Sequence, residues 1–96
     1  MVVVFVTFQY GNDFNQAKVR KIAQEASGKF RGVPQLRSKA FTVHPEAKRA
    51  TNVYVWESED AAKAFFTDEL VERVTGLYGV RPNIDLAQVA ALVENR

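Results

Sequence analysis

Two aromatic residues in one short segment have side chains suited to holding a substrate. Tyr54 and Trp56 stand two residues apart in VYVWESEDAAKAFF, so on a β-strand both side chains lie on the same face. Aromatic residues wall many ligand pockets, and they equally fill protein cores. Two hypotheses follow: the pair lines a cavity for a flat aromatic substrate, or Trp56 is a core residue, which is the usual role of a tryptophan on a central strand.

A lysine in the middle of an apolar strand is the next candidate. Lys39 lies in LRSKAFTV, where Arg37 and Lys39 share the alternation of Phe41 and Val43. Cations on an edge strand commonly prevent pairing with other chains, while their stems lie along apolar surface. The alternative is that Lys39 reaches a cavity and stabilises an anionic substrate, such as a phenolate or enolate formed before reaction with oxygen.

Other residues give weaker indications of a site. Strand alternation and helix spacing alone suggest three more lining residues, namely Phe8, Phe65 and Tyr78. His44 lies in a polar loop, and neither Ser38 nor Ser58 occupies the G-x-S-x-G turn of a serine hydrolase. The residues that would catalyse a reaction are therefore not assigned by the sequence.

The composition excludes several classes of protein. The 96 residues contain no cysteine and one histidine, which excludes thiolate nucleophiles, Cys-based metal centres and multi-histidine metal sites. No run approaches the ~18 apolar residues of a membrane span. The opening MVVVFV lacks the basic flank of a signal peptide and is typical of a first strand. We expect a cytoplasmic protein that binds no metal and no membrane.

Charge is distributed unevenly along the chain. Residues 1–50 hold nine Lys and Arg against three acids, and residues 51–96 hold four against eight. Such asymmetry can indicate a nucleic-acid-binding face, complementary surfaces in a dimer, or simply solvated faces. Solvated faces are the ordinary explanation.

The hydrophobic pattern indicates three helices and four strands. Residues 84–93 fit helical spacing locally, but two strands that are apolar on both faces require a fourth strand to complete the sheet. The expected elements are a strand at 2–10, a helix from an Asp13 N-cap to Gly28, strands at 36–43 and 51–56, two short helices within 58–76, and a last strand at 84–93.

This order predicts one α+β domain over residues 1–96, a ferredoxin-like βαββαβ fold with a four-stranded antiparallel sheet. Helices would cover one face of the sheet. The other face, with Val53 and Val55, would remain an exposed apolar patch. We therefore expect a homodimer that pairs through its sheet faces.

Three segments together resemble a known family. GVPQLRSKAF, VYVWESEDAAKAFF and LYGVRP, in this order, resemble the YdhR-like mono-oxygenases of the dimeric α/β-barrel superfamily, and the likeness covers nearly the whole chain. The resemblance implies a ferredoxin-like protomer that pairs into a barrel, with a pocket between sheet and helices. It also implies oxygen insertion into a small aromatic or polyketide-like substrate without a cofactor.

Two departures and two alternatives limit this interpretation. Haem-degrading relatives combine an asparagine on the first strand with a histidine in the helices, and this chain has Thr7 and Gln9 on that strand and no histidine in 58–78. Haem degradation is therefore not expected. The main alternative is a non-catalytic dimeric module that binds a small hydrophobic ligand. RNA binding is a distant third and no nucleic acid is expected, because KRATNVYVWE does not fit the RNP1 pattern in any register.

Overall fold

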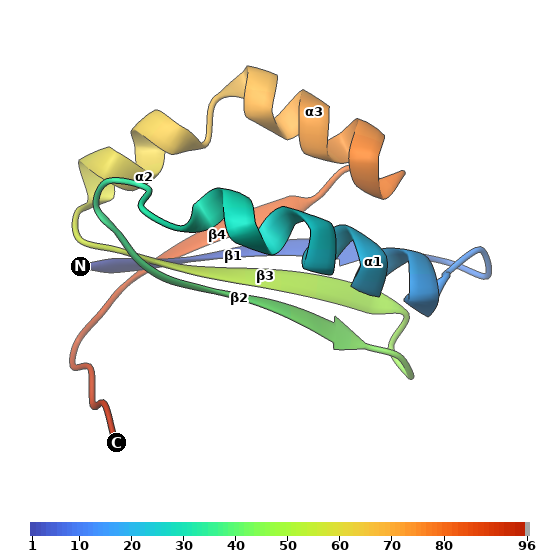
Figure 1. Ribbon diagram of the computed structural model, residues 1–96, viewed down its shortest axis with the longest axis horizontal. Coiled ribbons are helices and arrows are strands. Elements are labelled where there is room, and N and C mark those ends of the chain that lie inside the picture. Colours follow the sequence, from blue (N-terminus) through green and yellow to red (C-terminus); the bar gives the residue numbers. More distant parts are fainter. Residues whose placement is uncertain (96) are drawn as a thin grey trace.

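A computed structural model describes residues 1–95, and in it three α-helices and a short 3-10 helix cover one face of a four-stranded sheet (Figure 1). Each predicted element is present. In chain order the elements are β1 (Val2–Gln9), α1 (Gln16–Ala26), the 3-10 helix η1 (Ser27–Phe30), β2 (Leu36–His44), β3 (Arg49–Trp56), α2 (Glu59–Phe65), α3 (Asp68–Tyr78) and β4 (Asn83–Gln88).

The sheet is antiparallel throughout, with strand order β2-β3-β1-β4. The two strands that are apolar on both faces, β1 and β3, are the central pair, and Val4 lies opposite both Tyr54 and Leu86. This confirms the predicted ferredoxin-like α+β fold. Strands that are covered on both faces have continuous apolar sequences, and this pattern allowed β1 and β3 to be predicted as central.

Side chains alternate between the two faces of a strand, so every second residue of β1 and β3 lies beneath the helices. Val2, Val4, Val6 and Phe8 are buried, and on β3 the buried residues are Ala50, Asn52, Tyr54 and Trp56. From the helices, Val19, Ile22, Ala62 and Tyr78 complete the buried core. The core therefore lies between the sheet and the helix layer, as the two-residue period requires.

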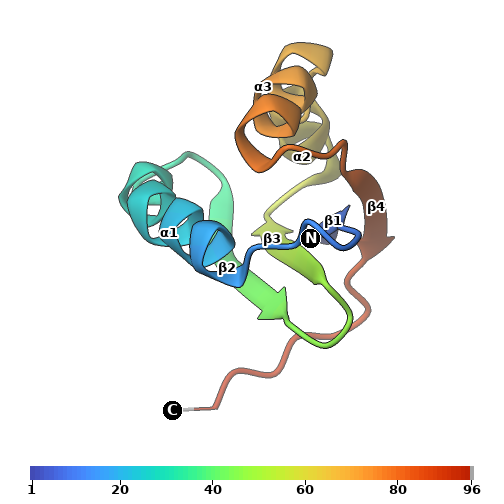
Figure 2. The same ribbon diagram turned by 90° about the vertical axis from the view of Figure 1, so that its right-hand side faces the viewer.

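The opposite face of the sheet carries no helix in residues 1–95 (Figure 2). Val3 lies opposite Val55 and Phe5 lies opposite Val53, so four apolar side chains form one patch across the two central strands. The Phe5 side chain is 37% exposed. We call these four residues the open-face patch.

The first helix begins and ends differently from the prediction. Asn15, not Asp13, is the N-cap, because its side chain accepts a hydrogen bond from the Lys18 N–H at 3.0 Å. Asp13 lies in a turn closed by the Phe14 N–H and the Gly11 carbonyl. At the other end the α-helix stops at Ala26 and tightens into η1, so Gly28 is not a helix stop.

Strand β2 is an edge strand, as predicted, but it contains a β-bulge. Leu36 pairs with Trp56 and Ser38 pairs with Val55, which leaves Arg37 as the extra residue. The bulge takes Arg37 out of the alternation that Lys39, Phe41 and Val43 share. Arg37 instead forms ion pairs with Glu57 and Glu94 near the surface.

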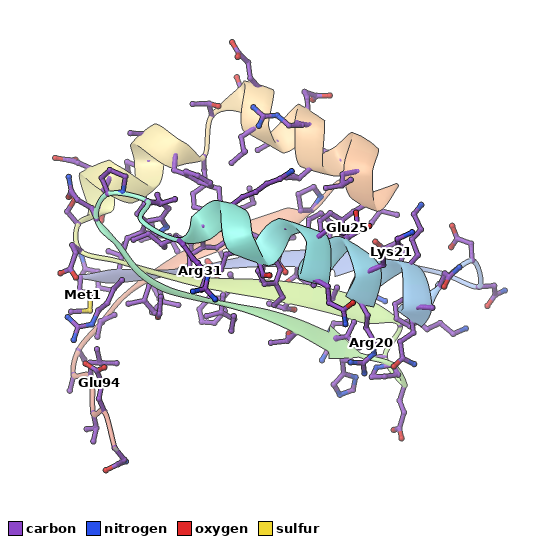
Figure 3. All side chains as sticks on the ribbon, viewed as in Figure 1. Met1, Arg20, Lys21, Glu25, Arg31 and Glu94 are labelled. Atoms are coloured by element: carbon purple, nitrogen blue, oxygen red, sulfur yellow. The ribbon has the colours of Figure 1, made fainter. Side chains whose placement is uncertain are left out.

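The last strand ends at Gln88, five residues before the predicted end at 93. Its antiparallel partner β1 begins at Val2, which pairs with Gln88, and the Val89 N–H then bonds to the Met1 carbonyl. The pairing between β1 and β4 ends at this point. The tail leaves the sheet on the side away from the helices, and Glu94 in the tail contacts Arg37 (Figures 1 and 3).

Candidate functional site

The helix layer and the sheet enclose a cluster of aromatic rings around β3. Tyr54 and Trp56 lie parallel with centroids 6.2 Å apart, and Trp56 also packs against Phe65 at 5.1 Å. Phe66 meets Tyr54 edge to face at 4.9 Å. Edge-to-face and offset pairs such as these stabilise a core beyond the area they bury.

Trp56 belongs to this packed core. It is 2% exposed, and its indole Nε1 is buried without a hydrogen-bond partner in residues 1–95. Phe8, another proposed lining residue, is fully buried and stacks on the Tyr78 ring at 3.8 Å. Trp56 and Phe8 are thus core residues in this structure, whereas the other proposed lining residues border a small cavity.

A small inner cavity of about 70 Å³ lies between the helices and the sheet. Four of the proposed residues meet there from different elements, namely Lys39, Tyr54, Phe65 and Tyr78. A second cavity of about 140 Å³ adjoins it beneath α1 and shares Phe41, Asn52 and Tyr78 with it. The fold therefore brings together side chains that are far apart in the sequence.

Asn52 and Tyr78 form a polar pair at the meeting point of the two cavities. Asn52 is 5% exposed, the one buried polar residue of the described chain, and its Nδ2 donates to the Tyr78 hydroxyl oxygen at 3.2 Å. Burial raises the pKa of Tyr78, although the bond from Asn52 opposes the shift. Tyr78 stays a neutral phenol whose own hydrogen can be donated to a ligand.

Asn52 was not among the site residues predicted from the sequence. The available signal was its position, because Asn52, Tyr54 and Trp56 alternate on a central strand and must share the helix-covered face. A polar side chain in such a row is buried and needs a partner. The partner, Tyr78, lies 26 residues further along the chain and could not be recognised from the pattern.

Lys39 lies inside an aromatic cage. Its Nζ is 3.3 Å from the Phe30 ring centroid, 4.1 Å from that of Phe41 and 4.3 Å from that of Tyr54. Burial lowers the pKa of Lys39 to about 7. The ring faces favour the ammonium and oppose this shift by about 1–2 kcal/mol, which is smaller than the cost of desolvating an ammonium. Both the amine and the ammonium are therefore accessible near neutral pH.

The described residues offer no obvious place for a metal. Within residues 1–95, no three His, Asp or Glu side chains are grouped so that they could hold an ion. No helix in the same range has the length and apolar character needed to cross a bilayer. The chemistry available at the site is that of an amine, an amide, a phenol and several aromatic walls.

No protein-family profile matches the chain, and no curated protein matches it. Solved structures do match, and they share the ferredoxin-like fold of this chain; several of them are named as antibiotic biosynthesis monooxygenases. A monooxygenase from the gene ActVA-Orf6 of Streptomyces coelicolor, solved with nanaomycin D, has a TM-score of 0.73 at 20% identity, covering 99% of this chain and 92% of its own.

Two Listeria monocytogenes proteins show the same similarity over 88% of this chain at 20% identity. One is an uncharacterised ferredoxin-fold protein related to antibiotic biosynthesis monooxygenases, with a TM-score of 0.66 over 53% of its own length. The other is a heme-degrading enzyme, with a TM-score of 0.65 over 59% of its own length. At these identities the likeness establishes the fold.

Proposed function

We propose that this protein is a monooxygenase that oxidises a small electron-rich aromatic or polyketide-like substrate without a bound cofactor, as in the YdhR-like resemblance. The main support is the meeting of Lys39 with the Asn52–Tyr78 pair in one aromatic-walled cavity. The fold is shared with a monooxygenase that was solved with nanaomycin D.

Lys39 is proposed to start the reaction as a base. Its neutral amine takes the proton of a substrate phenol, and the resulting ammonium stabilises the phenolate. The phenolate is electron-rich enough to reduce molecular oxygen directly. One oxygen atom forms a bond to substrate carbon, and the other leaves as water with two hydrogens from the substrate. The substrate therefore supplies all the electrons, and no further reductant enters the balance.

Asn52 and Tyr78 are proposed to stabilise the charge that develops on oxygen during this step. The Tyr78 hydroxyl accepts the bond from Asn52, which fixes its orientation and leaves its hydrogen for the substrate. Donors held in place in a buried site cost little reorganisation when charge appears. Phe65 and Tyr54 would form walls of the cavity in which the reacting oxygen lies.

Oxygen uptake with a panel of phenols, quinols and anthrones tests this function. We expect uptake by the purified protein, product carrying an atom from isotopically labelled oxygen, and a rate that rises with pH through about 7 as Lys39 loses its proton. Lys39→Met should lower the rate about 10²-fold or more. Lys29→Met removes a lysine that is exposed on η1 and should leave the rate unchanged.

Three results would contradict the proposal. They are stoichiometric flavin or haem in the purified protein, uptake that is indifferent to Lys39, or no uptake with any member of the panel. Ligand binding with no uptake would instead favour the non-catalytic module. RNA binding has little support, since Phe8, Tyr54 and Trp56 are buried and leave Phe5 as the exposed aromatic of β1 and β3.

We also propose that two copies pair through the open-face patch. Val3 and Val55 lie opposite one another, as do Phe5 and Val53, so the patch is continuous across both central strands. A small domain buries a limited share of its surface alone, and pairing would cover this patch. Face-to-face pairing also leaves the helix side, where the cavities lie, accessible to a substrate.

Val53→Lys should convert the protein from a dimer to a monomer, because a lysine at the centre of an apolar interface would bury an unpaired charge. Sedimentation equilibrium of both proteins measures the change. Ala64→Lys places a lysine at an exposed position of α2, on the helix side of the sheet, and should leave the dimer intact. A monomeric wild type, or a dimeric and folded Val53→Lys variant, would show that the patch is not the interface.

A further inference from the structure

The inner cavity is too small to hold a whole aromatic substrate. Ligand pockets commonly measure about 300–1,000 Å³, and the inner cavity measures about 70 Å³. An outer basin of about 330 Å³ lies beside it, between η1, the segment that follows η1, and the first half of β2. Phe30, Lys39 and Phe41 line both spaces, so they form the boundary between them.

The basin is basic. Three cations line it, Arg31, Arg37 and Lys39, and no acidic residue does. Arg37 is already paired with Glu57 and Glu94, and Lys39 is enclosed by rings at the boundary. Arg31 forms no ion pair with a residue in 1–95, and its side chain lies on the β2 side of the segment after η1 (Figure 3). It is the cation available to a ligand.

The segment that carries Arg31 is held in place at both ends. The Arg31 N–H bonds to the Gly28 carbonyl, and Gly32 adopts the left-handed conformation with φ of 76°. At the far end the Gln35 carbonyl accepts from the Glu57 N–H at 2.9 Å, and the Gln35 side chain accepts from the Ser58 hydroxyl at 3.1 Å. These contacts attach the basin rim to the start of α2, so Arg31 projects from a fixed backbone.

We propose that the outer basin is an anion subsite in which Arg31 binds a carboxylate of the substrate, so that the substrate is an aromatic hydroxy acid. This inference rests on the proposed function, which places the substrate hydroxyl at Lys39. The hydroxyl reaches Lys39 by entering past Phe30 and Phe41. A guanidinium presents parallel N–H groups that match a carboxylate. Lys39 then remains free to accept the phenolic proton, because Arg31 carries the anion.

Calorimetric titration with two matched probes tests the subsite. The probes are naphthol and a hydroxynaphthoate whose hydroxyl and carboxylate lie on different rings. Wild type should bind the hydroxynaphthoate about tenfold more tightly than naphthol, as expected for one charge-assisted contact. Arg31→Gln should remove this preference and leave naphthol affinity unchanged. Arg73→Gln removes an exposed arginine of α3 with the same change of charge and should alter neither affinity.

The proposal is overturned if wild type shows no preference, if it binds neither probe, or if Arg31→Gln weakens both probes equally. Oxygen uptake with the same two probes separates this inference from the proposed function. Uptake without a preference for the carboxylate removes the subsite and leaves the oxygenase. An Arg31-dependent preference without uptake keeps the subsite and removes the oxygenase.

Discussion

Replacing Trp56 by alanine is expected to lower the free energy of unfolding by about 3–5 kcal/mol. The indole is 2% exposed and packs against Tyr54, Phe65 and Phe66, so its removal leaves a cavity that the rigid sheet cannot close. Small domains have a total stability of about 5–15 kcal/mol, so the variant should be close to unfolding at 37 °C. Chemical denaturation followed by circular dichroism measures the loss.

Trp56→Phe is the matched comparison. Phenylalanine restores most of the apolar contact and removes the buried Nε1, which has no hydrogen-bond partner among residues 1–95. We expect this variant to lie within about 1 kcal/mol of wild type. Unchanged hydroxynaphthoate affinity in Trp56→Phe would confirm that Trp56 is a core residue. A stable Trp56→Ala protein would contradict the packing described here.

Replacing Asn52 by leucine is expected to lower the rate of oxygen uptake about 10²–10³-fold. Leucine has a similar volume but cannot donate to the Tyr78 hydroxyl, so Tyr78 loses the bond that orients it. Substrate affinity should change much less, because Tyr78, which Asn52 orients, acts on charge that appears during the reaction. The effect should therefore be on kcat and not on KM.

Steady-state kinetics of oxygen uptake measures this split. Asn83→Leu makes the same substitution at an exposed position on β4 and should change neither constant. Tyr78→Phe combined with Asn52→Leu should be little worse than either single change, because the two side chains act as one unit. If the fold-losses in rate of the two single variants multiply in the double variant, Asn52 acts independently of Tyr78.

The regular elements were predictable because local patterns specify them. Two-residue alternation located β1 and β3. Ser58 and Thr67 are residue types that favour helix N-caps, and at the starts of α2 and α3 their side chains accept from the Ala61 and Leu70 N–H groups. The chemistry-bearing residues were only partly predictable. Lys39 and Tyr78 were named, whereas Asn52 was missed because its partner lies on an element distant in sequence.

Two features depend on how strands pair with one another and could not be predicted from local sequence patterns. The bulge at Arg37 lies where β2 pairs with Val55 and Trp56 at the end of β3. β4 ends at Gln88, which pairs with Val2 at the start of β1. Neither pairing is visible within the segment that it affects, so alternation along β2 and length along β4 were misjudged.

Local sequence patterns were sufficient to predict the order of elements, the fold class and the buried face of each central strand, because hydrophobic period and helix caps act over a few residues. The position of Lys39 among Phe30, Phe41 and Tyr54, and the contact of Asn52 with Tyr78, became visible in the folded chain. Cavities, desolvation and hydrogen bonds depend on which surfaces meet in space. Those contacts join residues too far apart in the chain for any local pattern to encode.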